Sequence, residues 1–357
     1  MINKKEYNIN LIGYNRPDSF KSTLYNLSNT FYPNGIIINL IIHLDYCDEE
    51  MLKKHLHILE QLVWPYGDIT LNSNSYNKGL RTQIESVIDN SSDEWIIMFE
   101  DDLELSPLWF KYFLQTMETI QRLDISHVLG VSFYSYLISE VTYQNFTVIN
   151  PESYLMNIAA SWGFAINKKE WITYRNATNY KNVDLPKRIK KWGDNSWKKE
   201  LIRYMIFDNK YYVFPPRSYS SPSGTSGTNV RSNKNLFVTP ITTYVDRGNI
   251  DTNNVYSVTG YKIVNIRLQG NMVSAEIDLY ADLNYSTLEY VLSPIKSKIK
   301  YSISDSDRTY LESLGISLYL HSSVEYFQIK RKSKYKSHRH KFRYYTFYDV
   351  LSTLVRW

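Results

Sequence analysis

The first 165 residues alternate between short segments typical of β-strands and longer segments typical of α-helices. The strand-like segments cover residues 7–13, 36–44, 69–71, 95–99 and 127–133, and the helix-like segments cover residues 17–27, 49–62, 80–88 and 106–123. Strands separated by crossover helices are connected in the way that a parallel sheet requires. The alternation therefore predicts an α/β fold, a mostly parallel sheet with helices on both faces.

The pattern changes after these residues, and three parts are expected along the chain. A strand over 157–166, a helix over 195–206 and a strand over 210–214 complete a first domain over residues 1–235. A small β-rich region is predicted over 236–329, because apolar residues there recur at every second position and Gln269-Gly270-Asn271 is a hairpin signal. A basic, amphipathic tail follows over 330–357.

Charge is unevenly distributed along the chain. The net charge is +5, but residues 330–357 hold nine Lys and Arg against Asp349, a net of +8, so the remaining residues carry −3. A nucleic-acid-binding body would need a basic face of its own. We therefore expect no nucleic acid among the partners.

Composition narrows the class of protein further. With 357 residues, of which 43% are hydrophobic, the chain is able to bury a large core. The single cysteine, Cys47, excludes an intrachain disulfide framework and a cysteine-rich zinc module. No apolar run approaches the length of a membrane span, and no secretory signal is visible at Met1. We expect a soluble protein of a reducing, cytoplasmic compartment.

Three consecutive acidic residues, Glu100, Asp101 and Asp102, directly follow the apolar segment 95–99, and we call them the acidic triplet. Ligands of open parallel sheets bind at the carboxyl ends of the strands. Adjacent carboxylates repel one another unless a cation offsets them, and hard divalent ions bind carboxylate and diphosphate oxygens together. The alternative is a solvated acidic turn near a helix start. The buried strand before the triplet and Ser106-Pro107 after it favour a metal site.

The segment Trp95 to Phe113, which reads WIIMFEDDLELSPLWFKYF, resembles the metal-binding strand of GT-A glycosyltransferases. Within that fold it is most similar to the N-acetylglucosaminyltransferase I group, with its Glu-Asp-Asp segment, Leu-Glu, a proline and a Phe-x-x-Tyr-Phe-like helix. Three further segments resemble the family in the same order: Gly13-Tyr-Asn-Arg16-Pro17, His43-Leu-Asp45-Tyr-Cys47 and Ala160-Ser161-Trp162-Gly163-Phe164. The resemblance covers about residues 8–232 and implies a GT-A type, Rossmann-like sheet.

The resemblance also implies roles for the acidic triplet. Asp102, its last member, would bind Mn²⁺ or Mg²⁺ directly. Asp101 and Glu100 would approach the ribose or a water bound to the metal. Such a metal would clamp the diphosphate of a UDP-sugar donor.

Four further residues are implied to bind substrates. Asp45 would hydrogen-bond the uracil, and Arg16 would face the diphosphate, since a guanidinium fork matches phosphate geometry. Trp162 would line the acceptor side. Arg81, after Asn77-Lys78-Gly79, is a second possible contact to phosphate or sugar. The alternatives are a helix-capping role for Asp45 and a plain surface position for Arg16.

An inverting transferase needs a carboxylate to take the proton of the acceptor hydroxyl. The stretch from Lys191 to Trp197 resembles the Trp-x-Asp-x-x-Trp-like segment that supplies this base in the family, and its acid is Asp194. Flanking tryptophans would desolvate Asp194 partly and raise its basicity. Here Gly193 precedes the acid and Asn195 follows it, unlike the family. Asp194 as a helix cap is the alternative role, and Asp184 and Glu200 are the fallback bases.

Two other segments have open interpretations. The loop 218–232 is rich in Ser, Gly and Thr, and it is either a plain connection or a segment that closes over the bound donor. The tail 330–357 interleaves basic and aromatic residues, which suits an anionic membrane surface. The alternatives for the tail are a packed helix with a solvated charged face, or nucleic acid. His338 and His340 are interpreted as part of its basic cluster.

These observations and the resemblance predict a metal-dependent glycosyltransferase that moves a sugar from a UDP-sugar to a hydroxyl of a surface-glycan acceptor, free or lipid-linked. The resemblance implies that the transfer inverts the anomeric configuration. The expected location of the protein is the inner face of the plasma membrane, as a peripheral protein. The alternatives are a noncatalytic nucleotide-sugar-binding module and a nucleotidyltransferase. The latter expects a Gly-rich, basic phosphate loop after the first strand, and Gly13-Tyr-Asn-Arg-Pro is a poor one. A two-metal nuclease or phosphatase ranks below these, because it needs more acids or histidines from other strands.

Overall fold

The structure is a computed structural model, and it describes residues 6–137, 140–141, 152–223, 237–243, 249–256, 262–268 and 271–277. The chain divides into two compact units, and the first comprises residues 1–138 and 148–252. The predicted tail over 330–357, most of the predicted β-rich region over 236–329 and the second half of the loop 218–232 lie outside the described residues. The predicted domain boundaries therefore stay predictions.

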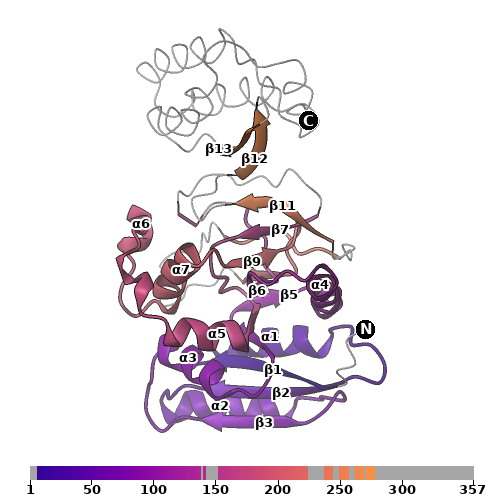
Figure 1. The fold of residues 1–357 in the computed structure, drawn as a ribbon. Helices are drawn as coiled ribbons and strands as arrows, with labels where there is room; N and C mark the ends of the chain where they lie inside the picture. The colour runs from indigo at the N-terminus through magenta and orange to yellow at the C-terminus, as the bar shows by residue number, and fades with distance from the viewer. Residues whose placement is uncertain are drawn as a thin grey trace, which may run out of the picture. The chain divides into compact units, whose positions relative to one another are not determined.

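The first unit is built around a mixed β-sheet (Figure 1). Its strands are β1 (Glu6–Gly13), β2 (Ile37–Leu44), β3 (Ile69–Ser73), β4 (Trp95–Glu100), β6 (Val128–Ser132), β7 (Ser153–Met156), β8 (Phe164–Asn167), β9 (Tyr211–Phe214) and the start of β11 (Ile250–Tyr256). Their order is β11-β7-β9-β6-β8-β4-β1-β2-β3. The strands β3, β2, β1 and β4 are all parallel, as are β6 and β9, whereas β8 runs antiparallel between β4 and β6.

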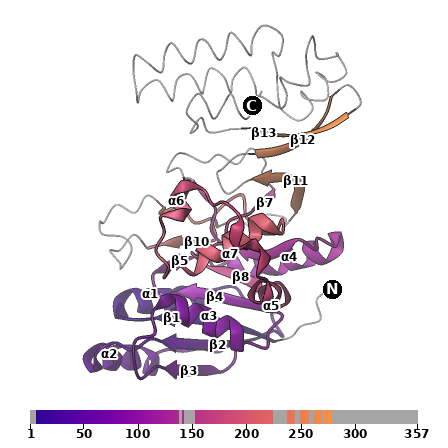
Figure 2. The ribbon, with the colours of Figure 1, turned by 60° about the vertical axis from the view of Figure 1, so that its left-hand side comes forward.

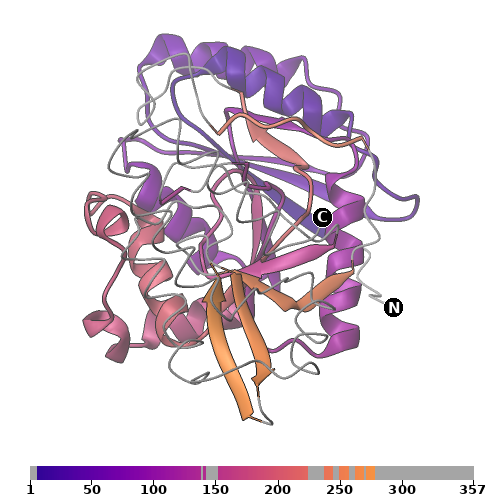
Figure 3. The ribbon, with the colours of Figure 1, turned by 90° about the horizontal axis from the view of Figure 1, so that it is seen from above.

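Helices cover both faces of this sheet. They are α1 (Pro17–Ser28), α2 (Glu49–Glu60), α3 (Leu80–Asn90), α4 (Trp109–Leu123), α5 (Lys168–Asn176), the short α6 (Lys187–Lys190) and α7 (Trp197–Phe207), with a 3-10 turn η1 (Asn179–Asn182). The Tyr7 ring of β1 packs edge-on against Phe110 and Phe113 of α4. Helix α3 packs against β1 and contacts α5 and α7. Seen from above, the strands lie between the magenta α4 and the pink α7 (Figure 3). The predicted α/β fold is confirmed.

Local sequence signals set the helix starts. The Asp48 side chain accepts a hydrogen bond from the Met51 amide at 2.8 Å, and Asn167 accepts one from the Glu170 amide at 3.1 Å. Asp and Asn are favoured at such positions because their side chains satisfy free amides of the first helical turn. Helix α4 starts at Trp109 rather than at Ser106, and the Ser106 hydroxyl accepts the Leu108 amide at 3.1 Å in the turn before it. Residues 103–105 form a strand.

That strand, β5 (Leu103–Leu105), pairs antiparallel with β10 (Ser220–Pro222) in a separate two-stranded sheet. Figure 2 shows the two strands side by side. Ser106 then donates its hydroxyl to the Thr242 carbonyl at 2.7 Å. The plain-loop interpretation of 218–232 is therefore wrong for residues 220–222, which form the buried strand β10, and residues 224–232 are not described.

The predicted single strand over 157–166 is also wrong. The structure places β7 before it and β8 at its end, and between them the chain turns at Gly163, whose φ is +81°. A β-carbon at Gly163 would meet the Phe99 ring at 3.0 Å, so glycine is needed both for the backbone angle and for space. The turn brings residues 161–163 to the end of β4.

The described part of the second unit contains the strands β12 (Lys262–Leu268) and β13 (Asn271–Ile277). They pair antiparallel from Lys262 with Ile277 to Leu268 with Asn271. The predicted hairpin around Gln269-Gly270 is confirmed. None of the helices that the structure describes has the length and apolar character that crossing a membrane requires.

Candidate functional site

Three parallel strands end at one edge of the sheet. Gly13 of β1 lies opposite Leu44 of β2, and Ile12 lies opposite Glu100 of β4. The residues that follow these strands therefore meet at the carboxyl ends, where open α/β sheets bind ligands. The Asp45 amide donates to the Gly13 carbonyl at 2.9 Å, which joins the first two strand ends directly.

Arg16 and the acidic triplet meet at this edge. The guanidinium of Arg16 donates to Asp102 with one terminal nitrogen and to Asp101 with the other. Asp101 also accepts the Tyr14 amide at 3.0 Å, and its side chain is almost fully buried. Arg16 is thus not a plain surface residue. In the structure it holds two carboxylates, and its contact with a diphosphate stays a prediction.

The charges in this cluster are only partly balanced. Burial raises the pKa of Glu100 to about 8, and the negative charges of Asp102 and Asp101 add to this rise, while the cations Arg16 and Lys198 oppose it. Burial likewise raises the pKa of Asp101 to about 6, against the opposing charge of Arg16. A buried carboxyl group keeps its proton to a higher pH when positive charges and hydrogen bonds do not fully offset its loss of hydration. The cluster would therefore be stabilised by a further cation.

Asp102 is freer than Asp101 to hold a divalent cation. Asp101 is committed to Arg16 and Tyr14, whereas Asp102 is about a quarter exposed and bonds Arg16 through Oδ2. Among the described residues, no group of three or more His, Cys, Asp and Glu side chains is arranged to hold a metal ion by itself. The remaining ligands would have to be water or oxygens of a bound diphosphate.

The backbone around Asp102 is fixed from two sides. Its carbonyl accepts the Ser223 amide at 2.8 Å, beyond the end of β10. The next residue, Leu103, exchanges two hydrogen bonds with the Thr23 hydroxyl of α1, at 3.0 and 3.2 Å. These contacts hold Asp102 where β4 ends.

Asp45 lies at the same edge of the sheet, but its carboxylate binds the neighbouring loop and not Arg16. It is buried, and its carboxylate accepts four hydrogen bonds at 2.8–3.1 Å, from the amides of Tyr46, Lys78 and Gly79 and from the side chain of Asn74. It therefore fastens the loop before α3 to the end of β2. This is not the helix cap weighed above, because Asp48 caps α2. A bond from Asp45 to uracil stays a prediction, and the carboxylate would have to make it in addition to these four.

Trp162 lies at the other side of the β4 end. Its ring contacts Tyr134 at 4.7 Å and Phe237 at 4.9 Å between centroids, so it belongs to an aromatic cluster. The Nζ of Lys198 lies over the Trp162 ring at 5.7 Å and over the Trp192 ring at 5.2 Å. The sequence reasoning missed Lys198, because in Trp197-Lys198-Lys199-Glu200 it is indistinguishable from a solvated charge.

Asp194 lies on the loop before α7, and its side chain is fully exposed. Its flanking tryptophans do not desolvate it: Trp197 is buried and stacks on Phe164, at 5.2 Å between ring centroids. The desolvation argument for Asp194 is therefore wrong. Asp194 is not the cap of α7 either, since Ser196 precedes that helix. The role of Asp194 as a base stays a prediction.

Basic residues hold the loop that carries Asp194. Arg81 of α3 donates to the Asp194 carbonyl and to Glu85. Lys199 donates to the Trp192 carbonyl at 2.8 Å and lies 3.4 Å from the Asp194 carboxylate. Arg81 touches the main chain of the predicted base, and its contact to phosphate or sugar stays a prediction.

The two fallback bases differ in their surroundings. Asp184 is mostly exposed and pairs with Lys190. Glu200 is about one-third exposed and pairs with Arg203, whose Nε lies 3.3 Å from it. Neither is brought to the acidic triplet by any contact that the structure records.

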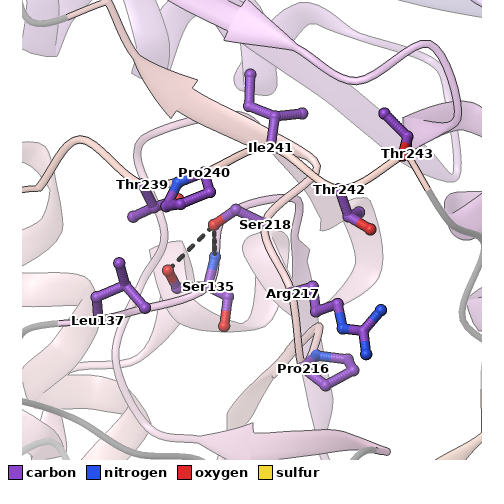
Figure 4. A pocket seen from close by; sticks show the side chains of 10 residues that line it. All are labelled: Ser135, Leu137, Pro216, Arg217, Ser218, Thr239, Pro240, Ile241, Thr242 and Thr243. Atoms are coloured by element: carbon purple, nitrogen blue, oxygen red, sulfur yellow. Dashed lines mark hydrogen bonds between the residues drawn. The ribbon is translucent and has the colours of Figure 1, made fainter.

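A pocket of about 330 Å³ is lined by other residues, from segments 135–137, 216–218 and 239–243 (Figure 4). The hydroxyl of Ser218 accepts the Ser135 amide at 2.7 Å and donates to the Ser135 carbonyl at 3.1 Å, which ties two of its walls together. None of the predicted site residues lines this pocket.

No protein-family model and no curated protein matches the sequence. Similar solved structures include the mannosyltransferase PcManGT from Pyrobaculum calidifontis in complex with GDP-Man and Mn²⁺ (11% identity, TM-score 0.40, 59% of this chain and 55% of that one). They also include S. aureus TarS 1-349 (10%, 0.38, 62% and 60%) and mouse xyloside xylosyltransferase 1 (10%, 0.38, 58% and 84%). The chain thus spans little more than half the length of the first two. Scores this low carry no inference about what this chain does.

Proposed function

We propose that this chain is a glycosyltransferase that takes a sugar from a nucleotide sugar. The observation that carries the proposal is the meeting of Arg16 with Asp101 and Asp102 at the carboxyl ends of β1 and β4. The two segments that resemble the GT-A family, around Arg16 and around the acidic triplet, are distant in sequence but form one cluster. A UDP-sugar is the proposed donor, and the resemblance to the N-acetylglucosaminyltransferase I group remains a prediction.

The chemistry of the cluster supports a diphosphate ligand. Asp102 is the residue that would hold Mn²⁺ or Mg²⁺, and such an ion supplies positive charge that stabilises the departing diphosphate. Glu100 and Asp101, whose pKa values are raised chiefly by burial, would be stabilised as carboxylates by the same positive charge. Arg16 keeps the two aspartates apart from one another and in place.

The transfer itself needs a base and a leaving group. In the proposed reaction the acceptor oxygen bonds to the anomeric carbon, the bond from that carbon to the diphosphate oxygen breaks, and the acceptor proton passes to Asp194. Asp194 is exposed, so an acceptor hydroxyl is able to reach it from solvent. Its basicity would then come from the bound acceptor, which excludes water, and not from the tryptophans. A surface glycan is the proposed acceptor, and inversion the proposed outcome.

A panel of nucleotide sugars tests this function. We expect slow hydrolysis of at least one UDP-sugar with Mn²⁺, and its loss with EDTA. Asp102→Ala should lower this turnover by at least about a thousandfold for every donor. Glu104→Gln is the matched control from the same acidic segment, since the Glu104 carboxylate accepts hydrogen bonds from Ser22 and Asn26 of α1.

The base is tested separately. Asp194→Ala should keep donor affinity and lose transfer to an acceptor, whereas Asp184→Ala and Glu200→Gln should retain transfer. Full transfer by Asp194→Ala would shift the base to Glu200 or Asp184. Donor binding without any turnover in the wild type would favour the noncatalytic module.

A further inference from the structure

The pocket drawn in Figure 4 has walls that are bonded to one another. Ser218 bonds to both of the other segments: its hydroxyl is tied to the Ser135 backbone, and its carbonyl accepts the Thr242 amide at 2.8 Å. The Thr242 carbonyl in turn accepts the Ser106 hydroxyl at 2.7 Å. A pocket held in this way is largely pre-formed, so little conformational entropy is lost when a ligand binds in it.

The residue types that line the pocket suit a sugar ring. Of the ten lining residues four are apolar and only Arg217, whose side chain is exposed, is charged. The other five carry hydroxyl groups: Ser135, Ser218, Thr239, Thr242 and Thr243. Hydroxyl groups donate and accept, as the hydroxyls of a sugar do, and apolar side chains cover the C–H groups on its faces. The volume of about 330 Å³ lies at the low end of the range for small-molecule sites, about 300–1,000 Å³, and suits one ring better than a nucleotide sugar.

Thr239 supplies the pocket wall with a buried hydroxyl that lacks a partner. The residue is 5% exposed, and its amide donates to the Ser221 hydroxyl at 3.0 Å. Its own hydroxyl makes no hydrogen bond with any residue that the structure describes. A buried polar group without a partner lowers stability, and a ligand that bonds to the group removes this cost. The wall therefore points to a ligand that carries hydrogen-bonding groups.

The pocket adjoins the aromatic cluster around Trp162. Tyr134 directly precedes Ser135 of one wall, and Phe237 lies two residues before Thr239 of another. Both rings contact the partly buried Trp162 ring, at 4.7 and 4.9 Å between centroids. The Tyr134 hydroxyl donates to the Phe237 carbonyl at 2.9 Å, which joins the two segments beside the pocket. A ligand in the pocket is therefore near the ring that the resemblance assigns to the acceptor side.

The third wall leads from the pocket to the acidic triplet. The chain runs from Ser218 through β10 to Ser223, whose amide binds the Asp102 carbonyl. Five extended residues span at most about 18 Å. No residue of the triplet lines the pocket, yet the pocket lies within the span of a short oligosaccharide that reaches Asp102.

We infer that this pocket binds one sugar unit of the glycan acceptor, remote from the hydroxyl that receives the transferred sugar. The inference rests on the proposed function, because it assigns a site to the acceptor of that reaction. Thr239 would hydrogen-bond the bound unit, and the cluster around Trp162 would contact the part of the acceptor that lies between the pocket and Asp102. Because binding of a remote unit also positions the reacting end, the pocket would raise both the affinity for long acceptors and their rate of transfer.

A glycan array and calorimetry test this inference. The labelled full chain is applied to immobilised oligosaccharides of increasing length, and dissociation constants are then measured for the series that binds most tightly. Thr243→Trp places an indole in the pocket from an exposed position, and it should weaken binding at least about tenfold and abolish the gain in affinity with length. Val238→Trp is the matched control, because Val238 is exposed on the same segment but does not line the pocket, and it should change the affinity less than about twofold.

Thr239→Val tests the buried hydroxyl by itself. Valine has nearly the same shape and lacks the hydroxyl, so binding of the same oligosaccharide should weaken about 3- to 10-fold. The midpoint of urea unfolding without glycan should stay the same or rise, because the variant removes a buried group that has no partner in the described structure. A residue that only supported the fold would give the opposite pattern, a lower midpoint at unchanged affinity.

The outcomes separate this inference from the proposed function. Unchanged affinity in both Thr243→Trp and Thr239→Val, equal losses in the two tryptophan variants, or binding of no oligosaccharide by the wild type would each overturn the inference. Hydrolysis of a UDP-sugar needs no glycan, so it would still support the proposed function in all three cases. If the wild type hydrolyses no nucleotide sugar, the proposed function fails, and with it the acceptor role of the pocket.

Discussion

The guanidinium of Arg81 donates a hydrogen bond to the main-chain carbonyl of Asp194, which lies 113 residues further along the chain. The bond joins the start of α3 to the loop that precedes α7. Because the carbonyl and not the carboxylate is held, Arg81 fixes the position of the loop and leaves the acid exposed. In the proposed enzyme Arg81 is thus a positioning residue for the base.

Arg81→Met should therefore lower transfer and spare donor binding. A misplaced base costs about 10- to 100-fold in kcat, whereas the donor dissociation constant should change less than about threefold. Arg175→Met is the matched control, because Arg175 pairs with Glu85 and Asp89 of the same helix and does not touch the loop. A weaker donor affinity at unchanged kcat would instead make Arg81 a contact to phosphate or sugar.

Gly163→Ala should destabilise the fold by about 2–3 kcal/mol. The added methyl group meets the Phe99 ring at 3.0 Å and the Ser220 hydroxyl at 3.2 Å, at a backbone angle that alanine disfavours. Gly35 has a similar backbone angle, φ +82°, but nothing lies near the β-carbon that an alanine would add there. Gly35→Ala should therefore lower the free energy of unfolding by only about 1 kcal/mol. Urea unfolding of both variants measures the difference. Equal losses would show that the angle alone matters.

Protonation of His43 should lower the free energy of unfolding as the pH falls. Burial lowers its pKa from 6.5 to about 4, and its Nε2 lies 3.0 Å from the Asn10 side-chain oxygen. Because the folded-state pKa is the lower one, the unfolded chain takes up the proton first as the pH falls. The contribution of His43 is complete above about pH 6.5 and is lost between 6.5 and 4, up to about 3 kcal/mol.

Urea unfolding at several pH values from 7.5 to 4 checks this contribution against His43→Gln. The wild type should lose about 3 kcal/mol more than the variant over that range. His55 and His127, whose pKa values are also lowered by burial, contribute equally to both proteins and cancel in the comparison. Parallel stability curves for the two proteins would contradict the prediction.

The predicted membrane contact of the tail is tested in the full chain. Replacing Lys330, Arg331, Lys332 and Lys334 by glutamine should weaken binding to anionic vesicles about a thousandfold, since each basic residue contributes about 1 kcal/mol at such a surface. UDP affinity should not change. Vesicles of zwitterionic lipid are the control and should bind both proteins weakly. Undiminished binding to anionic vesicles would refute the electrostatic role of the tail.

The elements of the parallel half could be predicted because their signals are local. The apolar run of β4, Pro17 at the start of α1 and the Asp48 cap each act within a few residues. Strand β8 could not be placed in the same way, because its antiparallel position between β4 and β6 depends on partners distant in sequence. Apolar residues lie on both sides of Gly163 in the sequence, so the segment reads as one continuous strand and the turn at Gly163 is not visible.

In the candidate site, too, features with a local sequence signal could be predicted, and features that depend on distant partners could not. The acidic triplet is visible in the sequence as charge after an apolar strand, but the pairing of Arg16 with it depends on the neighbouring positions of β1 and β4. The resemblance implies that Asp45 binds uracil, and the sequence does not reveal the four donors within the protein that its carboxylate accepts from. Lys198 carries no sequence signal at all, since only the folded chain places it between Trp162 and Trp192.

The pairing of β5 with β10 has a consequence for synthesis on the ribosome. The amide that fixes the Asp102 carbonyl belongs to Ser223, so the end of β4 is not fully bonded until the chain has emerged through that residue. Such a long loop closure makes the last step of folding slow relative to the local helices. A nascent chain halted before β10 would therefore carry Asp102 on a strand end that lacks this hydrogen bond.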